Sequence, residues 1–293
     1  LVKGHLGLAR GFAAQFSNGT GREEFREAQA TYRALIATDS GVPEAWYGLA
    51  DALFHEPPDF DSLDAMAARQ TASVRAFRRT LALDSTFHLA YSHLVAMYQQ
   101  MSVPQNWFVL DGDSVRLLND SARIQRAGGP AGVEAIRQRT RRTGFELARR
   151  WAVADAEASA PVITLAQGFF AAGMADSAVA TVDSAMARNP RLRTPGLILQ
   201  AGIYQLLADD PRGPATLLDA TRTTDIATFK RLPFNERFAS LAVAVSAAGA
   251  MGSGAEVERT AQLFTRVDPT IPFSTEPSEP MMRWYFAAVQ VAM

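Results

Sequence analysis

The sequence predicts an all-α fold, an α-solenoid of antiparallel helical hairpins. Hydrophobic residues, chiefly Ala, Leu and Val, make up 48% of the 293 residues and aromatic residues only 9%, which suits close packing of many short helices. Apolar residues recur at the spacing of two helices joined by a turn, and such units repeat along the chain. Prolines close several of these units, as expected where a helix must stop.

The first hundred residues contain four segments with this apolar spacing. These expected helices are residues 27–40, 43–54, 74–85 and 88–98. The first is the second helix of a unit and leads directly into Pro43, which opens the next helix. Residues 55–66 form a longer connection, in which Pro57 and Pro58 break the helix before a new start.

The clearest unit spans residues 159–192. Its spacing places apolar residues on two antiparallel helices: Leu165, Ala166, Phe169, Ala178, Val182, Ala185 and the closing Pro190. The small side chains of Ala166 and Ala178 let the helices approach, and Phe169 and Val182 fill the space between hairpins. Looser copies follow at residues 194–207 with 214–221, and at 238–254 with 257–269. We expect roughly five to six hairpins in all.

The unit at residues 159–192 resembles the tetratricopeptide repeat, a hairpin of about 34 residues. It shows a large residue, Leu-Ala and an aromatic on the first helix, then Ala, a bulky residue, Ala and a closing Pro; Val162 replaces the usual Trp. The resemblance implies a right-handed superhelix. Residues 44–54 and 76–94 are also similar to the C-terminal repeat regions of bacterial serine/threonine kinases and regulators, which implies a sensor or scaffold region.

Two stretches depart from the repeat. Residues 101–133 combine an apolar loop at 107–110 with Gly-rich punctuation, so we interpret them as an insertion. Residues 281–293 are almost wholly apolar but too short to span a bilayer, which takes about 20 residues. A helix that caps the solenoid is expected there, with a docking helix as the alternative. The expected parts are N-terminal repeats (1–100), an irregular insertion (101–133), C-terminal repeats (134–270), and a Pro-rich linker with a terminal helix (271–293).

The sequence contains no recognisable catalytic motif. It has no phosphate-binding Gly-rich loop, no G-x-S-x-G elbow and no H-E-x-x-H pair. It also has no Cys, which excludes disulfides, thiolate nucleophiles and zinc ribbons. We therefore predict that the protein is not an enzyme and uses no cofactor.

The four histidines and the short acidic pairs are possible metal ligands. His88 and His93 lie five residues apart on one expected helix, which splays them by about 140°; His55 would come from the neighbouring unit. Two pairs of aspartates stand two residues apart, Asp59 with Asp61 and Asp111 with Asp113. Neither pair lies in the twelve-residue calcium-binding loop of an EF-hand. We predict no metal site and keep a hydrolase or metal protein as a third alternative.

The repeat register predicts a partner-binding groove, because the first helices of tetratricopeptide hairpins line a concave face. The matching positions are Glu44, Tyr47, Asp51, Phe54, His55, Leu89, Ser92, His93, Gln99, Gln100, Ile163, Gln167, Phe170, Leu197, Ala201, Tyr204 and Gln205. These residues differ from the carboxylate-clamp subfamily, which has Lys, Asn and Arg there. An extended or helical peptide segment with apolar anchors is the expected occupant.

Two further surfaces are candidates for contact with other molecules. Exposed apolar docking residues are expected at Trp107, Phe108, Trp284 and Phe286. Six arginines close together in the sequence form a basic patch, and Glu146 is the only acidic residue among them. The patch consists of Arg137, Arg139, Arg141, Arg142, Arg149 and Arg150. This patch predicts either an anion-seeking face or an ordinary solvated helix surface.

The expected function is a non-enzymatic interaction scaffold, or a peripheral subunit of a larger assembly such as a membrane-bound one. The alternative is a regulatory domain of a bacterial signalling protein such as a serine/threonine kinase. A net charge of −1 gives no general attraction to nucleic acid or anionic membrane. We expect protein partners, no nucleic acid, and membrane contact that is peripheral or through a partner. The sequence does not begin with Met, which predicts a trimmed chain: either a leader has been removed or the chain is a piece of a longer protein. The absence of Cys favours a periplasmic or membrane-peripheral location over a cytoplasmic one.

Overall fold

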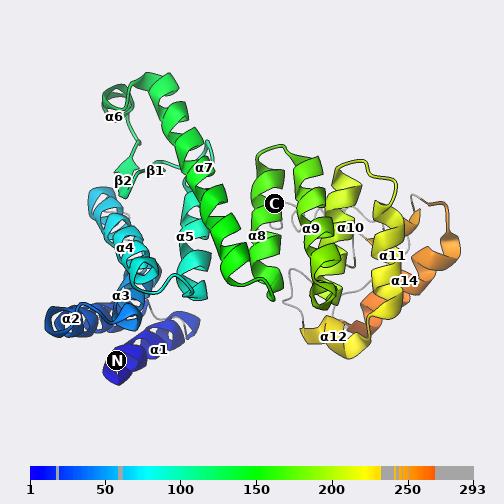
Figure 1. Cartoon of the computed structure of the whole chain (residues 1–293), viewed down its shortest axis with the longest axis horizontal. Helices are drawn as coiled ribbons and strands as arrows, with labels where there is room; N and C mark the ends of the chain where they lie inside the picture. The colour runs from blue at the N-terminus through cyan, green and yellow to red at the C-terminus, as the bar shows by residue number, and fades with distance from the viewer. Residues whose placement is uncertain are drawn as a thin grey trace. The chain divides into compact units, whose positions relative to one another are not determined.

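The computed structural model describes residues 1–17, 20–58, 62–231, 241, 244–245, 247–249 and 251–267. These residues are mostly helical, which confirms the predicted all-α class (Figure 1). The chain divides into two compact units, Leu1–Ala156 (unit 1) and Glu157–Met293 (unit 2). The predicted four-part division stays a prediction.

Unit 1 begins with five helices, each packed against the next in the chain. They are α1 (Val2–Phe16), α2 (Arg22–Thr38), α3 (Pro43–His55), α4 (Leu63–Leu83) and α5 (His88–Gln100) (Figure 1). Pro43 stands at the first position of α3, where its missing N–H costs nothing. Between α4 and α5, the Asp84 carboxylate accepts hydrogen bonds from the backbone N–H and hydroxyl of Thr86, which sets the turn.

The core of this part of unit 1 centres on Tyr32 of α2. Its ring is fully buried, and its hydroxyl lies 2.9 Å from Nδ1 of His5 on α1. Both neighbouring helices carry glycine where they face the ring, Gly4 on α1 and Gly48 on α3. A Cβ at Gly48 would lie 2.2 Å from Cζ of Tyr32, so the close approach of α2 and α3 requires a glycine there.

Unit 1 ends with a β-hairpin and two further helices. These elements are β1 (Phe108–Asp111), β2 (Ser114–Leu117), α6 (Ser121–Arg126) and α7 (Gly129–Ala154). The strands pair antiparallel with Asp111 opposite Ser114, and α5 packs on α7. The hairpin and α6 therefore lie within the connection between two packed helices.

The β-hairpin corrects the expectation of an irregular apolar loop at residues 107–110. Val109 and Leu110 of β1 are buried, and the hydroxyl of Thr140 on α7 donates to the carbonyl of Leu110. On the other side, the N–H of Val115 in β2 donates to the hydroxyl of Thr71 on α4 at 2.9 Å. The apolar side chains thus fill the space between α4 and α7, which explains why they form paired strands instead of a loop.

Unit 2 is again built of helical hairpins. Its elements are α8 (Ser159–Ala171), α9 (Ala175–Arg188), the 3-10 helix η1 (Pro190–Leu192), α10 (Pro195–Leu207), α11 (Gly213–Thr223), α12 (Ile226–Arg231) and α14 (Gly254–Val267). Ala166 of α8 and Ala178 and Val182 of α9 are fully buried in one cluster. This is the close approach of small residues that the repeat spacing predicts.

Some predicted features lie outside the described residues. They are Asp59, Asp61, Trp284, Phe286, the linker at 271–280 and the terminal helix at 281–293. Among the described residues, none of the helices combines the length and the apolar character required to cross a bilayer.

Candidate functional site

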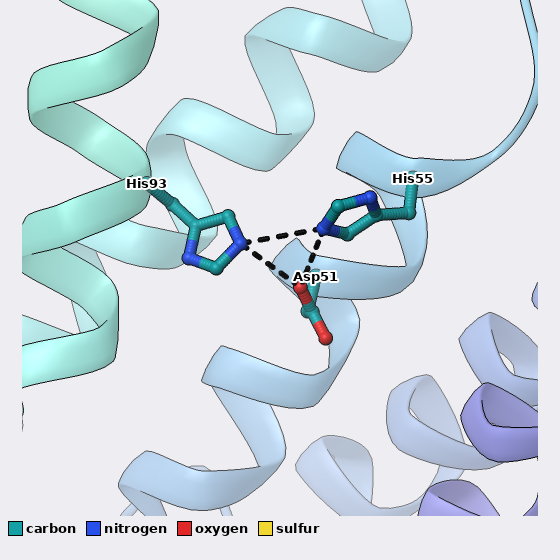
Figure 2. Close-up of side chains that lie close together, drawn as sticks. All are labelled: Asp51, His55 and His93. Atoms are coloured by element: carbon teal, nitrogen blue, oxygen red, sulfur yellow. Dashed lines mark hydrogen bonds and ion pairs between the residues drawn. The ribbon is translucent and has the colours of Figure 1, made fainter. Parts of the chain in front are cut away.

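Three side chains of α3 and α5 converge in unit 1. Asp51 and His55 are four residues apart on α3 and therefore share one face of that helix. Figure 2 shows them meeting His93 of α5. Oδ1 of Asp51 lies 3.4 Å from Nε2 of His55 and 3.3 Å from Nε2 of His93, and the two Nε2 atoms are 3.4 Å apart. We call these three residues the acid–histidine cluster.

The His93 ring is oriented by the backbone of its own helix. Its Nδ1 lies 2.9 Å from the carbonyl oxygen of Leu89, one turn earlier on α5. Because a carbonyl oxygen only accepts hydrogen bonds, this contact places a proton on Nδ1. The Nε2 atom that faces the acid–histidine cluster is then left with a lone pair in the neutral ring.

Aromatic rings surround the two imidazoles. Phe12 and Phe54 each meet the His55 ring edge to face at 4.8 Å between centroids. Phe77, which is fully buried, stacks on His93 at 5.0 Å with an interplanar angle of 20°. These rings keep water from most sides of the acid–histidine cluster, so electrostatic interactions within it are stronger than in water.

The cluster is half-buried, and burial shifts its pKa values. The side chains of Asp51, His93 and His55 are 10%, 19% and 32% exposed. Burial raises the pKa of Asp51 above its usual value, although the charge of His93 acts in the opposite direction. Burial, helped by the charge of His93, lowers the pKa of His55 to about 4. His55 is therefore a neutral imidazole at pH 7.

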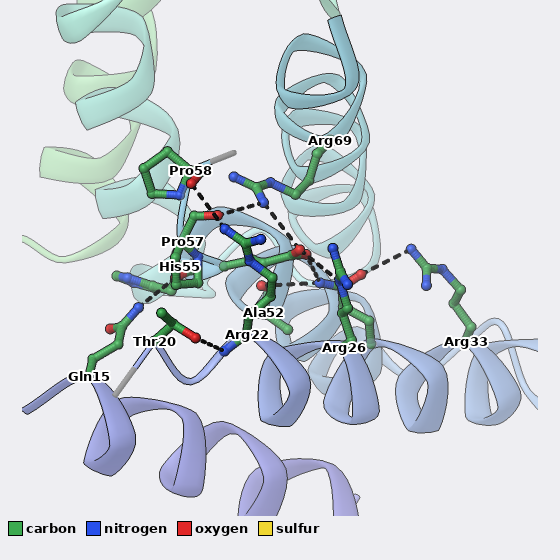
Figure 3. A network of polar contacts seen from close by, with 12 residues as sticks. Gln15, Thr20, Arg22, Arg26, Arg33, Ala52, His55, Pro57, Pro58 and Arg69 are labelled. Carbon is green, nitrogen blue, oxygen red and sulfur yellow. Dashed lines mark hydrogen bonds and ion pairs between the residues drawn. The ribbon is translucent and has the colours of Figure 1, made fainter. Parts of the chain in front are cut away.

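The end of α3 that carries His55 is fixed by polar contacts to three other helices (Figure 3). Nε2 of Gln15 on α1 donates to the backbone carbonyl of His55 at 2.9 Å. The next residue, Glu56, is buried. Its carboxylate accepts hydrogen bonds from Arg26 at 3.0 Å and Gln29 at 2.8 Å, both on α2, and forms an ion pair with Arg69 of α4 at 3.3 Å. These contacts, the Glu56 network, hold the backbone of His55 in place.

The groove positions predicted in unit 1 differ in accessibility. Glu44, Leu89 and Gln100 are exposed, and Asp51 is buried, which corrects its expected place on an open groove. The side chain of Asp51 is enclosed because His55 and His93 cover it. The half-buried positions are Tyr47, Phe54, His55, Ser92, His93 and Gln99.

The groove positions predicted in unit 2 are partly wrong. Ile163 and Phe170 of α8 are half-buried and Gln167 is exposed. The four positions on α10 are buried: Leu197, Ala201, Tyr204 and Gln205. The reason is that α10 packs against α8, α9 and α11, so most of its circumference is covered.

The two predicted docking residues that the structure describes differ in exposure. Trp107 is 59% exposed beside a hollow of about 300 Å³ near the start of α7, whereas Phe108 is half-buried in β1.

Two of the six arginines of the basic patch have acceptors within unit 1, and the choice between an anion-seeking face and a solvated helix surface stays a prediction. Arg137 donates to the carbonyls of Pro104 and Asn106 at 2.8 and 3.2 Å, and Arg139 pairs with Asp111 at 3.2 Å. The insertion before α7 supplies these acceptors. Arg141 is half-buried, and the other members are exposed: Arg142, Arg149 and Arg150.

Sequence reasoning missed the acid–histidine cluster because it compared His88 with His93. His88 points elsewhere and its Nδ1 lies 3.6 Å from Oδ2 of Asp155. The sequence does contain one indication of this cluster. Asp51 and His55 are four residues apart, which places both on one face of the expected helix.

Comparison with known proteins does not assign a family. No family model matches the sequence, and no curated protein does. One similar solved structure comes from the functional characterization of Pseudomonas aeruginosa pilF. It is 10% identical over 98% of this chain and 96% of that chain, with a TM-score of 0.48. We draw no functional conclusion from this similarity.

Proposed function

We propose that the protein is a non-enzymatic interaction module, in which unit 1 binds a segment of a partner protein. The observation that supports this proposal is a group of mutually packed, half-buried aromatic side chains on α3 and at the start of α5. This aromatic surface consists of Tyr47, Phe54, His55, Phe87 and His93. Tyr47 contacts Phe87 at 4.9 Å between ring centroids, and Phe54 contacts His93 at 5.3 Å.

The chemistry of this surface suits a peptide or helix with apolar anchors. Aromatic side chains that are already held in place lose little conformational freedom when a partner covers them, which favours their use as binding hot spots. Leu89 is 56% exposed next to the group, and Glu44 supplies an exposed charge on α3. An apolar centre with a polar edge is the usual arrangement of a protein interface.

Affinity purification of the native chain from its own cells, with mass spectrometry of the proteins that accompany it, tests this function. The test variants are Tyr47→Ala and Phe54→Ala. A matched control is Phe16→Ala, because Phe16 is 90% exposed on α1 and lies outside the aromatic surface. Loss of a hot spot costs about 2 kcal/mol, so each test variant should bind the partner about 30-fold more weakly and recover correspondingly less of it.

The outcome also separates the two roles that the sequence leaves open. A stoichiometric set of other subunits supports a scaffold or peripheral subunit. Recovery as part of a longer polypeptide with a kinase domain supports a regulatory domain. Full binding by both aromatic variants, with loss on Trp107→Ala, would place the interface at the β-hairpin and refute the aromatic surface.

A further inference from the structure

The three facing atoms of the acid–histidine cluster form a nearly equilateral triangle with sides of 3.3 to 3.4 Å. A zinc-class ion binds nitrogen and oxygen ligands at about 2.0–2.1 Å, and in tetrahedral geometry such ligands lie about 3.3–3.4 Å from one another. Adjacent ligands of an octahedral ion at the same bond length would be closer, about 2.9 Å apart. The triangle therefore has the dimensions of one face of a tetrahedral site.

We propose that Asp51, His55 and His93 bind a zinc-class divalent transition-metal ion through Oδ1 of Asp51 and the two Nε2 atoms. The chemistry of the donors agrees with this choice, because two imidazoles and one carboxylate suit zinc and its neighbours. Magnesium and calcium prefer ligand sets made of oxygen atoms, so they are poor candidates.

Contacts outside the triangle also suit a metal site. The hydrogen bond between Nδ1 of His93 and the carbonyl of Leu89, 2.9 Å long, leaves a lone pair on Nε2, the ring nitrogen that lies near Asp51 and His55. Outer contacts of this kind fix the tautomer and orientation of histidine ligands. The Glu56 network fixes the end of α3 at His55 in the same way. The ligands thus approach the geometry of the bound state before an ion enters.

A tetrahedral ion has a fourth ligand position, and the acid–histidine cluster is least covered at His55. Asp51 is 10% exposed and His55 is 32% exposed, so solvent reaches the cluster past His55. Water, or a donor atom of another molecule, would complete the coordination. A site with three protein ligands and one open position differs from the closed four-ligand sites that serve structure alone.

The test uses the full chain, stripped with a chelator and then titrated with Zn²⁺ by calorimetry and with Co²⁺ by visible absorption. Tetrahedral Co²⁺ absorbs strongly and six-coordinate Co²⁺ weakly, so the spectrum reports the geometry. We expect one ion per chain and an intense spectrum. Substitution of an outer contact alone costs 10–100-fold in metal affinity, so loss of a ligand should weaken binding by about 100-fold or more.

The ligand variants are His55→Gln and His93→Gln, and the matched control is His88→Gln. His88 lies on α5 with His93 but pairs with Asp155 outside the cluster. Circular dichroism verifies that each variant is folded. If His93→Gln fails to fold, His55→Gln alone still tests the site, because His55 is the more exposed ligand. Loss of binding in the ligand variants with retention in His88→Gln supports the site. Absence of binding, binding that survives in folded His55→Gln, or a six-coordinate spectrum overturns it. None of these measurements depends on a protein partner.

Discussion

The packing of Tyr32 makes Gly48 sensitive to the smallest possible substitution. We expect Gly48→Ala to lower the free energy of unfolding by about 1–3 kcal/mol, because an added methyl group must displace a ring enclosed by neighbouring helices. The ring cannot easily turn away, since Gly4 of α1 also lies close to it and its hydroxyl is hydrogen-bonded to His5. Denaturant unfolding followed by circular dichroism measures this change.

Gly254→Ala is the control, because a Cβ at Gly254 meets no atom within 4 Å. Its effect should stay within about 0.5 kcal/mol. Equal destabilisation by both substitutions would show that the contact with Tyr32 is not the cause.

Glu56 is the second residue whose loss should be costly. Its carboxylate faces Arg69, and the two side chains are 7% and 13% exposed. Glu56→Gln leaves this guanidinium half-enclosed without its anion, and breaking such a pair costs about 3 kcal/mol. The exposed pair of Lys3 and Glu27, 3.9 Å apart, offers the same substitution as a control. Glu27→Gln should change stability by less than about 1 kcal/mol. Thermal unfolding that ranks the two variants in the opposite order would contradict this account.

At the scale of elements, the β-hairpin depends on the turn at Gly112. This residue has φ +64°, in the left-handed region, and follows Asp111 at the end of β1. Gly112→Ala should therefore cost about 1 kcal/mol from backbone strain, since no neighbouring atom would be hit. We expect faster amide exchange in β1 and β2, with α1 and α2 unchanged. Gly112→Asn should cost less, because Asn tolerates this conformation better.

The sequence predicts the helices well because their apolar periodicity arises from burial of one face, which the structure also requires. It predicts the β-hairpin poorly for a different reason. Each strand is only four residues long, and its apolar side chains are buried against α4 and α7. The local sequence around the strands carries no information about these two helices. The Asp111-Gly112 pair between apolar runs was the one local signal of a hairpin.

The candidate site shows the same limit. The register places Tyr47, Phe54 and His93 on two expected helices of successive units, and in the structure the rings of Tyr47 and Phe54 both contact His93. It cannot give the rotation of α10, which depends on helices packed on several sides, and so it places Leu197 and Tyr204 on an open surface. Distances between side chains of different helices, as between His55 and His93, are likewise absent from a repeat pattern.

At the scale of the whole molecule, the two units should fold separately. Each has its own buried clusters, one around Phe25 and Leu49 in unit 1 and another around Val182 and Leu197 in unit 2. We expect residues 1–156 and 157–293, expressed apart, each to be helical and to unfold cooperatively. Circular dichroism with thermal scans tests this, and a fragment that remains unfolded would contradict it.

The position of the β-hairpin has a consequence for synthesis on the ribosome. In a simple repeat array each helix finds its partners as soon as the next one emerges. Here α4 contacts residues far downstream: Thr71 bonds Val115, 44 residues later, and Asp64 bonds Arg123, 59 residues later. At about 5–20 residues per second, the nascent α4 keeps this face uncovered for roughly 3–12 seconds. The packing of α4 is therefore complete only after residues 115–123 have been made, later than in a simple repeat array, where the next helix alone would cover it.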